Sequence, residues 1–171
     1  MDDIRTEHIT RLTTEEWKVR FTVHKLEEHE TQTALSLAWE VFSEYESPYY
    51  SPEGTEEFHK CLYDEKYLAG IEYYGACDSG RLVGMVGIRK EQCHICFFFV
   101  DDKFHRLGIG TRLFEQIKAE YHGKTITLNS SPYGLPFYQS LGFHKTDSEQ
   151  TVNGIRFTPM TIQIKRNGER N

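Results

Sequence analysis

The order of apolar and polar positions in the first half of the chain predicts one strand followed by two helices. Residues 20–26 alternate between apolar and polar side chains, which is the period of a half-buried strand. Between residues 31 and 46 apolar side chains recur every three or four positions, so this segment is predicted to form a helix with one buried stripe. Ser51 followed by Pro52 is a typical helix start, because serine caps free N–H groups and proline has none to cap. The second helix is predicted to bury Phe58, Cys61 and Leu62.

The second half of the chain opens with strands. Residues 71–77 and 81–88 are rich in β-branched and aromatic side chains, and residues 78–80 between them suit a tight hairpin turn. Residues 93–100 are too apolar for a half-exposed strand and too few for a buried helix, so they predict a central strand covered on both faces. The remaining predicted elements are a helix over 108–123, a strand over 125–129, a short helix over 137–141 and strands over 143–146 and 155–164.

This order of elements predicts the α/β class, with a mixed sheet covered by helices on both faces. The chain contains no internal repeat, low-complexity tract or long linker, so residues 20–171 are predicted to form a single domain. Residues 1–19 are predicted to be a peripheral N-terminal extension. Within it, Thr13 and Glu16 have the spacing of a capping box for one helical turn.

Composition narrows the class of protein. The 171 residues are 38% hydrophobic and 13% aromatic, which suffices to bury a core and excludes a disordered chain. The longest unbroken apolar run, residues 95–100, is far too short to span a membrane. The acidic start lacks the pattern of a signal peptide, and the four cysteines are too unevenly spaced for a disulfide framework. We therefore expect a cytoplasmic protein without a membrane partner.

The net charge argues against one class of partner and is divided unevenly along the chain. A net charge of −6 disfavours nucleic acid, which requires a positive field. Residues 27–79 hold 13 acidic and 2 basic residues, a net of −11, whereas residues 81–171 hold 8 acidic and 13 basic residues, a net of +5. The acidic half is either a set of solvated helix faces or a side that favours a cationic substrate, with the basic half favouring a polyanionic one.

The junction after the central strand has the composition of an anion site. The strand ending at Val100 runs through a turn, with the sequence HRLGIG at residues 105–110, directly into a helix. Backbone N–H groups in such a turn and the positive end of the helix dipole bind phosphate. The dinucleotide fingerprint is absent because Leu113 stands at its third glycine, and no P-loop sequence follows. The alternative explanation of the two glycines is close packing of the helix.

A second segment, with the sequence LNSSPYGLPFYQSLGF at residues 128–143, resembles the closing region of the GNAT superfamily of N-acetyltransferases. In that family the pattern N-x-S-x-x-A/G-x-x-F-Y-x-x-x-G-F follows a strand. The upstream turn is similar to the family's Q/R-x-x-G-x-G/A acetyl-CoA motif, with His105 in the first position. The resemblance extends over residues 20–165 in element order. It implies a mostly antiparallel sheet with a splayed pair of central parallel strands.

The resemblance implies a place for acetyl-CoA as the cosubstrate. The pantetheine arm would extend along the end of the central strand, and the pyrophosphate would lie over the turn that follows. Asn129 would contact the pantetheine amides, and Tyr138 would hold its hydroxyl near the thioester sulfur unless it is only a core aromatic residue. The residues implied in cofactor binding are Phe98, Phe99, Val100, His105, Arg106, Leu107, Gly108, Ile109, Gly110, Thr111 and Asn129.

Transfer to an amine requires a base. An alkylammonium with a pKa near 10.4 is neutral in only about one molecule in 2,500 at pH 7. In several members of the family a glutamate six residues before the position of Val100 removes the proton, and here that residue is His94. A free histidine titrates near neutrality, so His94 could serve, or it could be a hydrogen-bonded structural residue. The other candidate bases are Glu44 and Glu46.

The connection between the first two helices is where acceptors approach in this family. Residues 44–50 combine acids with tyrosines, which suits an amine cation, although ordinary packing of the connection explains the composition as well. The substrate residues expected there are Glu44, Tyr45 and Tyr49.

No metal site is predicted. Cys93 and Cys96 have the spacing of metal ligands, but residues three apart in a strand point to opposite faces, so the two thiols cannot reach one ion. Asp101 and Asp102 are interpreted as a solvated turn after the strand rather than as a cation site.

Two function classes follow from these observations. The first is an N-acetyltransferase that moves acetyl from acetyl-CoA to a primary amine by direct attack in a ternary complex, with Tyr138 as general acid to the thiolate. The second is a non-catalytic acyl-CoA-binding module that acts as a regulator or sensor. Tyr138 and a base at His94 favour the enzyme, because a sensor needs neither. The expected partners are a small-molecule or peptide amine and, as is common in this family, a second copy of the chain in a homodimer.

Overall fold

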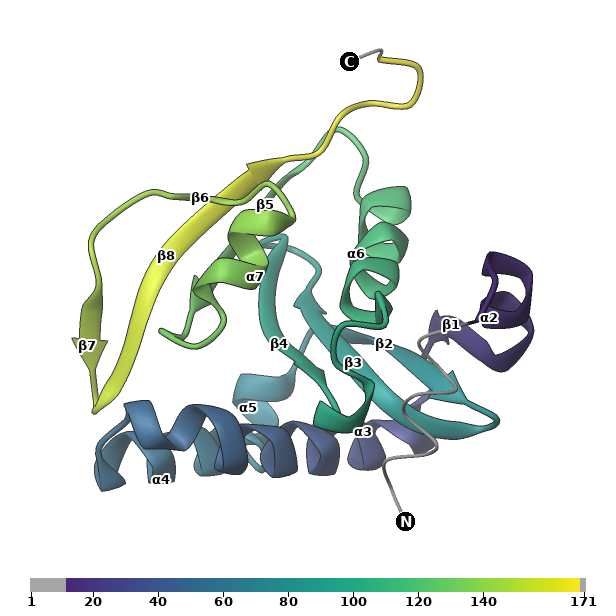
Figure 1. Ribbon diagram of the computed structural model, residues 1–171. Helices are drawn as coiled ribbons and strands as arrows, with labels where there is room; N and C mark the ends of the chain where they lie inside the picture. Colours follow the sequence, from purple (N-terminus) through teal and green to yellow (C-terminus); the bar gives the residue numbers. More distant parts are fainter. Residues whose placement is uncertain (1–11, 170–171) are drawn as a thin grey trace.

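The computed structural model describes residues 12–169 and places one mixed sheet between two layers of helices (Figure 1). The strands are β1 (Phe21–Lys25), β2 (Ile71–Asp78), β3 (Arg81–Arg89), β4 (His94–Val100), β5 (Thr125–Ser130), β6 (His144–Lys145), β7 (Gln150–Val152) and β8 (Ile155–Gln163). Their order is β1-β2-β3-β4-β5-β8-β6, and β7 pairs with β8 beyond this path. Of the strand pairs within residues 12–169, only β4 with β5 is parallel. The predicted α/β fold with a mostly antiparallel sheet is confirmed.

Helices cover both faces of this sheet. They are α2 (Thr14–Arg20), α3 (Glu28–Val41), α4 (Pro52–Cys61), α5 (Glu65–Leu68), α6 (Ile109–Glu120) and α7 (Leu135–Ser140). One core lies beneath α3 and includes Ala34, Leu37 and Phe97. The other lies beneath α6 and includes Leu113, Phe114 and Ile117. Each core is built from the apolar stripe of its helix and the matching face of the strands, as the helical periodicity predicts.

The helix predicted over residues 31–46 begins earlier and ends differently. α3 starts at Glu28 because Glu27 and Glu30 form a reciprocal capping box. This start was not predicted, because the usual sequence signal for a capping box is a serine or threonine at the N-cap. After Val41 the chain continues as a π-helical turn, η1 (Phe42–Glu46), and then as a 3-10 turn, η2 (Ser47–Tyr49). The wider π turn changes the direction in which the last side chains of the helix point.

Local sequence signals predicted some of the short elements and missed others. The Ser51 cap of α4 and the two-residue turn of the β2–β3 hairpin form where they are predicted. Helix α5 and strand β7 were missed, because each has only three or four residues and a polar sequence. Helix α7 starts at Leu135, two residues before the predicted start.

The capping box of Thr13 and Glu16 is present in both directions, at 2.8 and 3.2 Å, and α2 extends from it over two turns. Residues 1–11 lie outside the described residues. The boundary between an extension over 1–19 and a domain over 20–171 therefore stays a prediction.

The two central parallel strands separate soon after they meet. β4 and β5 pair only at His94 with Thr127 and at Ile95 with Leu128. The next residue of β4, Cys96, is the extra residue of a bulge against β3, since Gly87 pairs with Phe97 and Ile88 with Ile95. Beyond this bulge the edge of β4 that faces β5 has no strand beside it. The predicted splayed pair is confirmed, and it opens the space for the site described below.

A close glycine contact holds α4 against the turn between β7 and β8 (Figure 1). A Cβ added to Gly54 would lie 2.1 Å from the carbonyl oxygen of Gly154, far inside van der Waals contact. Helix propensity alone favours alanine over glycine by up to about 1 kcal/mol, so propensity and packing predict opposite signs. Because the contact is with backbone, we expect Gly54→Ala to lower the free energy of unfolding by about 1–3 kcal/mol in urea titrations. The exposed neighbour Glu53→Ala is the control, and a stabilised Gly54→Ala would refute the argument.

No helix within residues 12–169 combines the length and the apolar composition needed to cross a membrane.

Candidate active site

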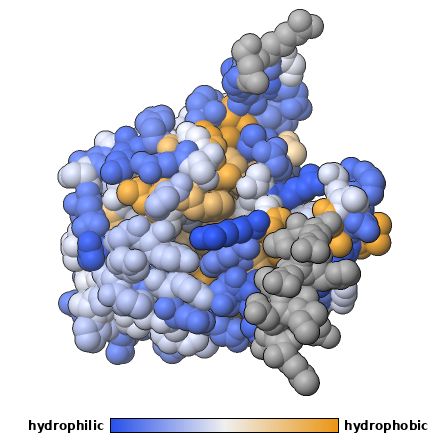
Figure 2. All heavy atoms as spheres, viewed as in Figure 1, coloured by the Kyte–Doolittle hydropathy of each residue, from blue (hydrophilic) through white to orange (hydrophobic). Residues whose placement is uncertain are grey.

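Two cavities meet where β4 and β5 separate. The turn-side cavity, of about 480 Å³, lies between the end of β4, the start of α6 and α7. The ring-lined cavity, of about 400 Å³, lies between β4, α4, the end of β5 and the β7–β8 hairpin. The residues that line both cavities are Glu46, Phe98, Phe99 and Tyr138. Figure 2 shows the face viewed in Figure 1 as largely polar, with apolar side chains gathered near its centre.

The turn-side cavity collects most of the residues predicted to bind a cofactor. Of that set, the residues on its wall are Phe98, Phe99, Val100, His105, Arg106, Gly108, Ile109, Gly110 and Thr111. Leu107 lies in the same turn without lining the cavity, and Asn129 lines the ring-lined cavity instead.

The turn before α6 has the geometry of an anion site. Gly108 is the N-cap of α6 with φ +78°, and a Cβ placed there would have no neighbour within 4 Å. The preceding Arg106 is also left-handed, with φ +63°, and its exposed side chain carries a positive charge at the rim. The first N–H groups of α6 have no partner within the helix. They face the space in front of the helix N-terminus, where the helix dipole favours negative charge. Open space, free donors and positive potential together fit a phosphate group.

Contacts from distant segments hold this turn in place. His105 Nε2 donates to the carbonyl oxygen of Val100 at 2.7 Å, so this side chain closes the turn onto the end of β4. Trp17 Nε1 donates to the carbonyl oxygen of Leu107 at 3.0 Å, and the guanidinium of Arg112 lies 5.1 Å from the Trp17 ring. Sequence reasoning missed Trp17, because nothing local indicates that α2 lies beside a turn 90 residues away.

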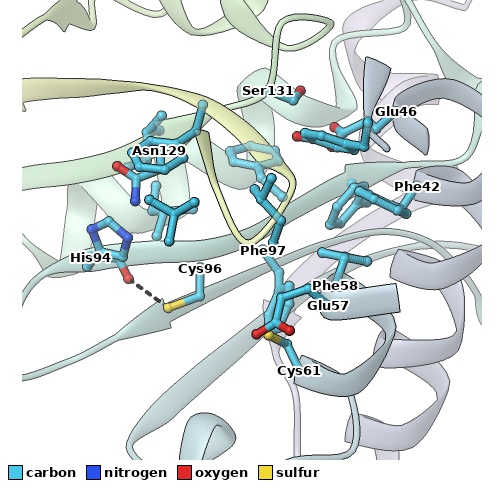
Figure 3. A pocket seen from close by; sticks show the side chains of 18 of the residues that line it. Phe42, Glu46, Glu57, Phe58, Cys61, His94, Cys96, Phe97, Asn129 and Ser131 are labelled. Carbon is cyan, nitrogen blue, oxygen red and sulfur yellow. Dashed lines mark hydrogen bonds between the residues drawn. The ribbon is translucent and has the colours of Figure 1, made fainter. Parts of the chain in front are cut away.

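The ring-lined cavity is apolar in its walls and acidic at two points (Figure 3). Phe42 lies parallel to two rings, Phe58 at 3.8 Å and Tyr50 at 5.3 Å between centroids. Figure 3 shows Glu46 near one end of the cavity and Glu57 near another. No lysine or arginine is among the residues that line it.

Glu46 has the most unusual carboxyl group of the site. It is the last residue of the π turn, and its side chain reaches the junction of the two cavities. Burial raises the pKa of Glu46 from 4.5 to about 7, and a hydrogen bond from Ser131 opposes that rise. A carboxyl group with a pKa near 7 exchanges a proton readily at neutral pH. Of the two glutamates considered as alternative bases, this one lies at the junction.

Tyr138 lies at the same junction with a protonated hydroxyl. Its ring packs at 6.0 Å from Phe98 and at 5.9 Å from Phe143, both edge-on. Burial raises the pKa of Tyr138 well above its usual value of 10, and the nearby Glu46 and Tyr50 add to the shift. The hydroxyl therefore keeps its proton at neutral pH and can donate a hydrogen bond into either cavity.

His94 lies farther along the ring-lined cavity, at the point where β4 and β5 still pair. Its Nδ1 is 2.8 Å from the hydroxyl oxygen of Thr127. Burial lowers the pKa of His94, and the charge of Arg89 lowers it further, so the imidazole is neutral at pH 7. Figure 3 shows His94 beside Asn129 and on the other side of the cavity from Glu46.

The three residues expected to contact substrate line neither cavity. Glu44 is exposed, and Tyr49 is 41% exposed. The hydroxyl of Tyr45 donates to the carboxylate of Asp102, which lowers the pKa of Asp102 and raises that of Tyr45. The ring of Tyr45 stacks at 5.6 Å on Tyr133, which lines the turn-side cavity. The same segment instead contributes Glu46 and Tyr50 to the ring-lined cavity.

Within the described part of the chain, no group of three or more His, Cys, Asp and Glu side chains is placed to hold a metal ion. Cys93 packs against the core beneath α6, and Cys96 packs against the core beneath α3. The two thiols thus lie on opposite faces of the sheet. The reason differs from the prediction, because β4 begins at His94 and Cys93 lies in the preceding turn with φ +50°.

Comparisons with known proteins agree with this geometry. Residues 46–164 match the family model described as an acetyltransferase (GNAT) domain. A GCN5-related N-acetyltransferase from Rhodopseudomonas palustris is 19% identical, with a TM-score of 0.70 over 83% of this chain and 94% of its own. The PaiA N-acetyltransferase from Thermoplasma acidophilum, solved in complex with coenzyme A, is 18% identical, with a TM-score of 0.64 over 84% of this chain and 98% of its own. The ribosomal-protein-S18-alanine N-acetyltransferase from Escherichia coli is 19% identical, with a TM-score of 0.55 over 88% and 98%.

Proposed function

The chain belongs to the GNAT acetyltransferase family, and we propose that it moves an acetyl group from acetyl-CoA to a primary amine by direct attack in a ternary complex. One observation carries the proposal. Two cavities, one suited to a phosphate-bearing cosubstrate and one suited to an amine, meet at a carboxyl group and a phenol. The two reactants can thus occupy adjoining cavities and meet at Glu46 and Tyr138, which is what direct transfer requires.

Acetyl-CoA would occupy the turn-side cavity. The N–H groups from Arg106 to Thr111 would hold its pyrophosphate, and the free edge of β4 at Phe98 to Val100 would bind the pantetheine amides. When bound, it supplies a thioester carbonyl to the junction. The coenzyme A complex of the Thermoplasma protein, a structural neighbour, supports this assignment. Asn129 lies outside this cavity, so we do not propose it as a pantetheine contact.

Glu46 would act as the general base. Its carboxylate accepts a proton from the ammonium of the acceptor, and the neutral nitrogen forms its bond to the thioester carbon as the carbon–sulfur bond breaks. The nitrogen loses its second proton as the amide forms, that proton is passed to the departing thiolate, and coenzyme A leaves as the thiol. Glu46 then releases the first proton to solvent. Glu46 is preferred to His94 because it lies where the cavities meet.

Tyr138 would stabilise the leaving sulfur. A thiol has a pKa near 8.5, far below that of this buried phenol, so complete transfer of the phenolic proton to the thiolate is unfavourable. A hydrogen bond donated from the hydroxyl to the developing thiolate requires no such transfer. We therefore refine the role of Tyr138 from proton donor to hydrogen-bond donor.

We propose an amine acceptor of small size and no nucleic-acid or membrane partner. The homodimer and the cytoplasmic location remain predictions from the sequence.

The proposal is tested first by binding at the turn. Acetyl-CoA at 100 times its Kd should stabilise the protein by about 2.7 kcal/mol, a shift of several degrees in Tm. We expect Gly108→Asp to lower that affinity by at least about tenfold, because its carboxylate would face the pyrophosphate. Gly108→Asn is the matched control: asparagine has the same size, tolerates the left-handed conformation and carries no charge. Equal affinities for the two variants would show that the pyrophosphate lies elsewhere, and no shift with wild-type protein would refute the cosubstrate.

Released thiol then separates the two function classes. Turnover with any amine in a broad panel supports the transferase. Stabilisation by acetyl-CoA without turnover of any amine would instead support the non-catalytic acyl-CoA-binding module.

A further inference from the structure

We infer that the acceptor is an arylalkylamine that carries no carboxylate and bears a hydrogen-bond donor on its ring. This inference rests on the proposed function, since it assigns the occupant of the ring-lined cavity. It follows from three properties of that cavity: the sign of its charges, the nature of its walls and the position of its second carboxyl group.

The charges on the cavity wall disfavour acids as acceptors. Among the described residues, Glu46 and Glu57 line it without an ion pair, whereas no lysine or arginine does. Arg89, whose charge acts on the lining residues His94 and Cys96, is not on the wall and donates hydrogen bonds to the carbonyl oxygens of Ala69 and Tyr67. An amine enters as a cation and is attracted to this negative field. The α-carboxylate of an amino acid would be brought beside these groups without a partner, which is costly in a poorly solvated site. The acceptor should therefore resemble an amino acid that has lost its carboxylate.

The walls of the cavity favour an aromatic body over a linear chain. The stacked rings of Tyr50, Phe42 and Phe58 form one wall. Phe97 and Phe99 meet Phe58 edge-on, at 6.1 and 5.8 Å, and continue that surface from β4. Phe42, Phe97 and Phe99 are buried within this arrangement, whereas Tyr50 and Phe58 at the ends of the stack are only half-buried. A flat apolar group can pack against these two end rings, and the ammonium beside it gains from cation–π attraction. A linear polyamine, with charges along its whole length, would leave its inner ammonium groups against hydrocarbon.

The second carboxyl group supplies a contact for the far end of the acceptor. Glu57 and Cys61 are four residues apart on α4 and therefore share one face, and the charge of Glu57 contributes to the raised pKa of that thiol. Figure 3 shows the two side chains together, away from Glu46 and Ser131. A purely apolar ring would desolvate Glu57 without replacing its hydrogen bonds. A ring that carries a hydroxyl donates one, so a phenol is favoured over an unsubstituted phenyl group.

Four amines of similar size test these points, with acetyl-CoA as donor and released thiol as readout. They are tyramine, phenethylamine, tyrosine and tyrosine methyl ester. We expect kcat/KM to be about tenfold higher for tyramine than for phenethylamine, the value of one hydrogen bond to a charged group. Tyrosine should be at least about 100-fold poorer than tyramine. Its methyl ester carries no negative charge and should recover most of that loss when kcat/KM is compared per neutral amine, because esterification also lowers the pKa of the amino group.

The role of Glu57 is tested with a matched pair of variants. In Glu57→Gln the preference for tyramine over phenethylamine should fall to about threefold or less, whereas Glu53→Gln on the exposed side of α4 should keep it. Binding of tyramine, followed as a shift in Tm with coenzyme A present, should weaken in Glu57→Gln in parallel. This second readout does not depend on turnover.

The possible outcomes distinguish a failure of this inference from a failure of the proposed function. If tyrosine is used as well as tyramine, the charge argument is wrong. If the ratio of kcat/KM for tyramine to that for phenethylamine is unchanged in Glu57→Gln, the proposed role of Glu57 is wrong. A linear polyamine such as spermidine used tenfold better than every aromatic amine would overturn the aromatic body while leaving N-acetyl transfer intact. If neither these amines nor any amine of a wider panel causes release of thiol, the proposed function itself is wrong.

Discussion

We expect Glu46→Gln to lower turnover by about 10²-fold at pH 7 while acetyl-CoA affinity changes by less than a few-fold. Glutamine keeps the size of the side chain and its hydrogen bond with Ser131, and it loses only the ability to accept a proton. Without that base the reaction depends on the neutral amine in solution, about one molecule in 2,500 at pH 7. The measurement is kcat/KM for one amine from pH 5.5 to 9.5.

The shape of the pH profile identifies the base. In the wild-type protein kcat/KM should rise as Glu46 loses its proton, with a midpoint at about pH 7. In Glu46→Gln that limb should be absent, and the rate should climb steadily toward the pKa of the amine, so that the two proteins converge at high pH. His94→Gln is the comparison, and it should retain the limb near pH 7. If His94→Gln loses that limb and Glu46→Gln keeps it, the base is His94.

Glu46→Gln should also change stability with a sign that depends on pH. A carboxyl group whose pKa is raised by burial favours the fold while it is protonated. That contribution is complete below the unfolded value of 4.5 and is lost as pH rises through about 7. The glutamine variant should therefore be more stable than wild type at pH 8, by up to about 3 kcal/mol, and no more stable at pH 4. A variant that is less stable at pH 8 would show that Glu46 is not held in a desolvated place.

The second large effect concerns Tyr138→Phe, which we expect to reduce kcat by about 10²-fold. The substitution removes one hydroxyl and keeps the ring, so the edge-on contacts with Phe98 and Phe143 remain. If the hydroxyl acts on the leaving sulfur, the loss should appear in kcat with little change in KM or in acetyl-CoA affinity. Single-turnover rates should be measured as well, because they report the chemical step directly.

A leaving group that needs less help distinguishes this role from a structural one. With an acyl donor whose thiol has a lower pKa, the deficit of Tyr138→Phe should shrink, because less charge must be stabilised on sulfur. A deficit that is equal for both donors would indicate a positioning role. Turnover at the wild-type rate, where chemistry limits that rate, would make Tyr138 a wall of the cavities and nothing more.

Local patterns in the sequence determined the longer elements and their order. The Ser51 cap, the hairpin turn and the strand–turn–helix junction at Gly108 are each encoded by a few neighbouring residues. Such signals depend on backbone sterics and on the period of burial, which are the same in any protein. For the same reason the turn-side cavity contains most of the residues expected in it, since they form one continuous segment from β4 into α6.

The acceptor side and the choice of base required the tertiary structure. Glu44, Tyr45 and Tyr49 were expected to contact the substrate, but after the π turn it is Glu46 and Tyr50 that line the ring-lined cavity. Glu57 comes from the buried side of α4, and its cavity closes only when the β7–β8 hairpin packs against that helix. The raised pKa of Glu46 likewise comes from burial, and the hydrogen bond that opposes it comes from Ser131, which is 85 residues away in the chain. Contacts of this kind arise from how distant segments pack and desolvate one another, and no local period or motif records them.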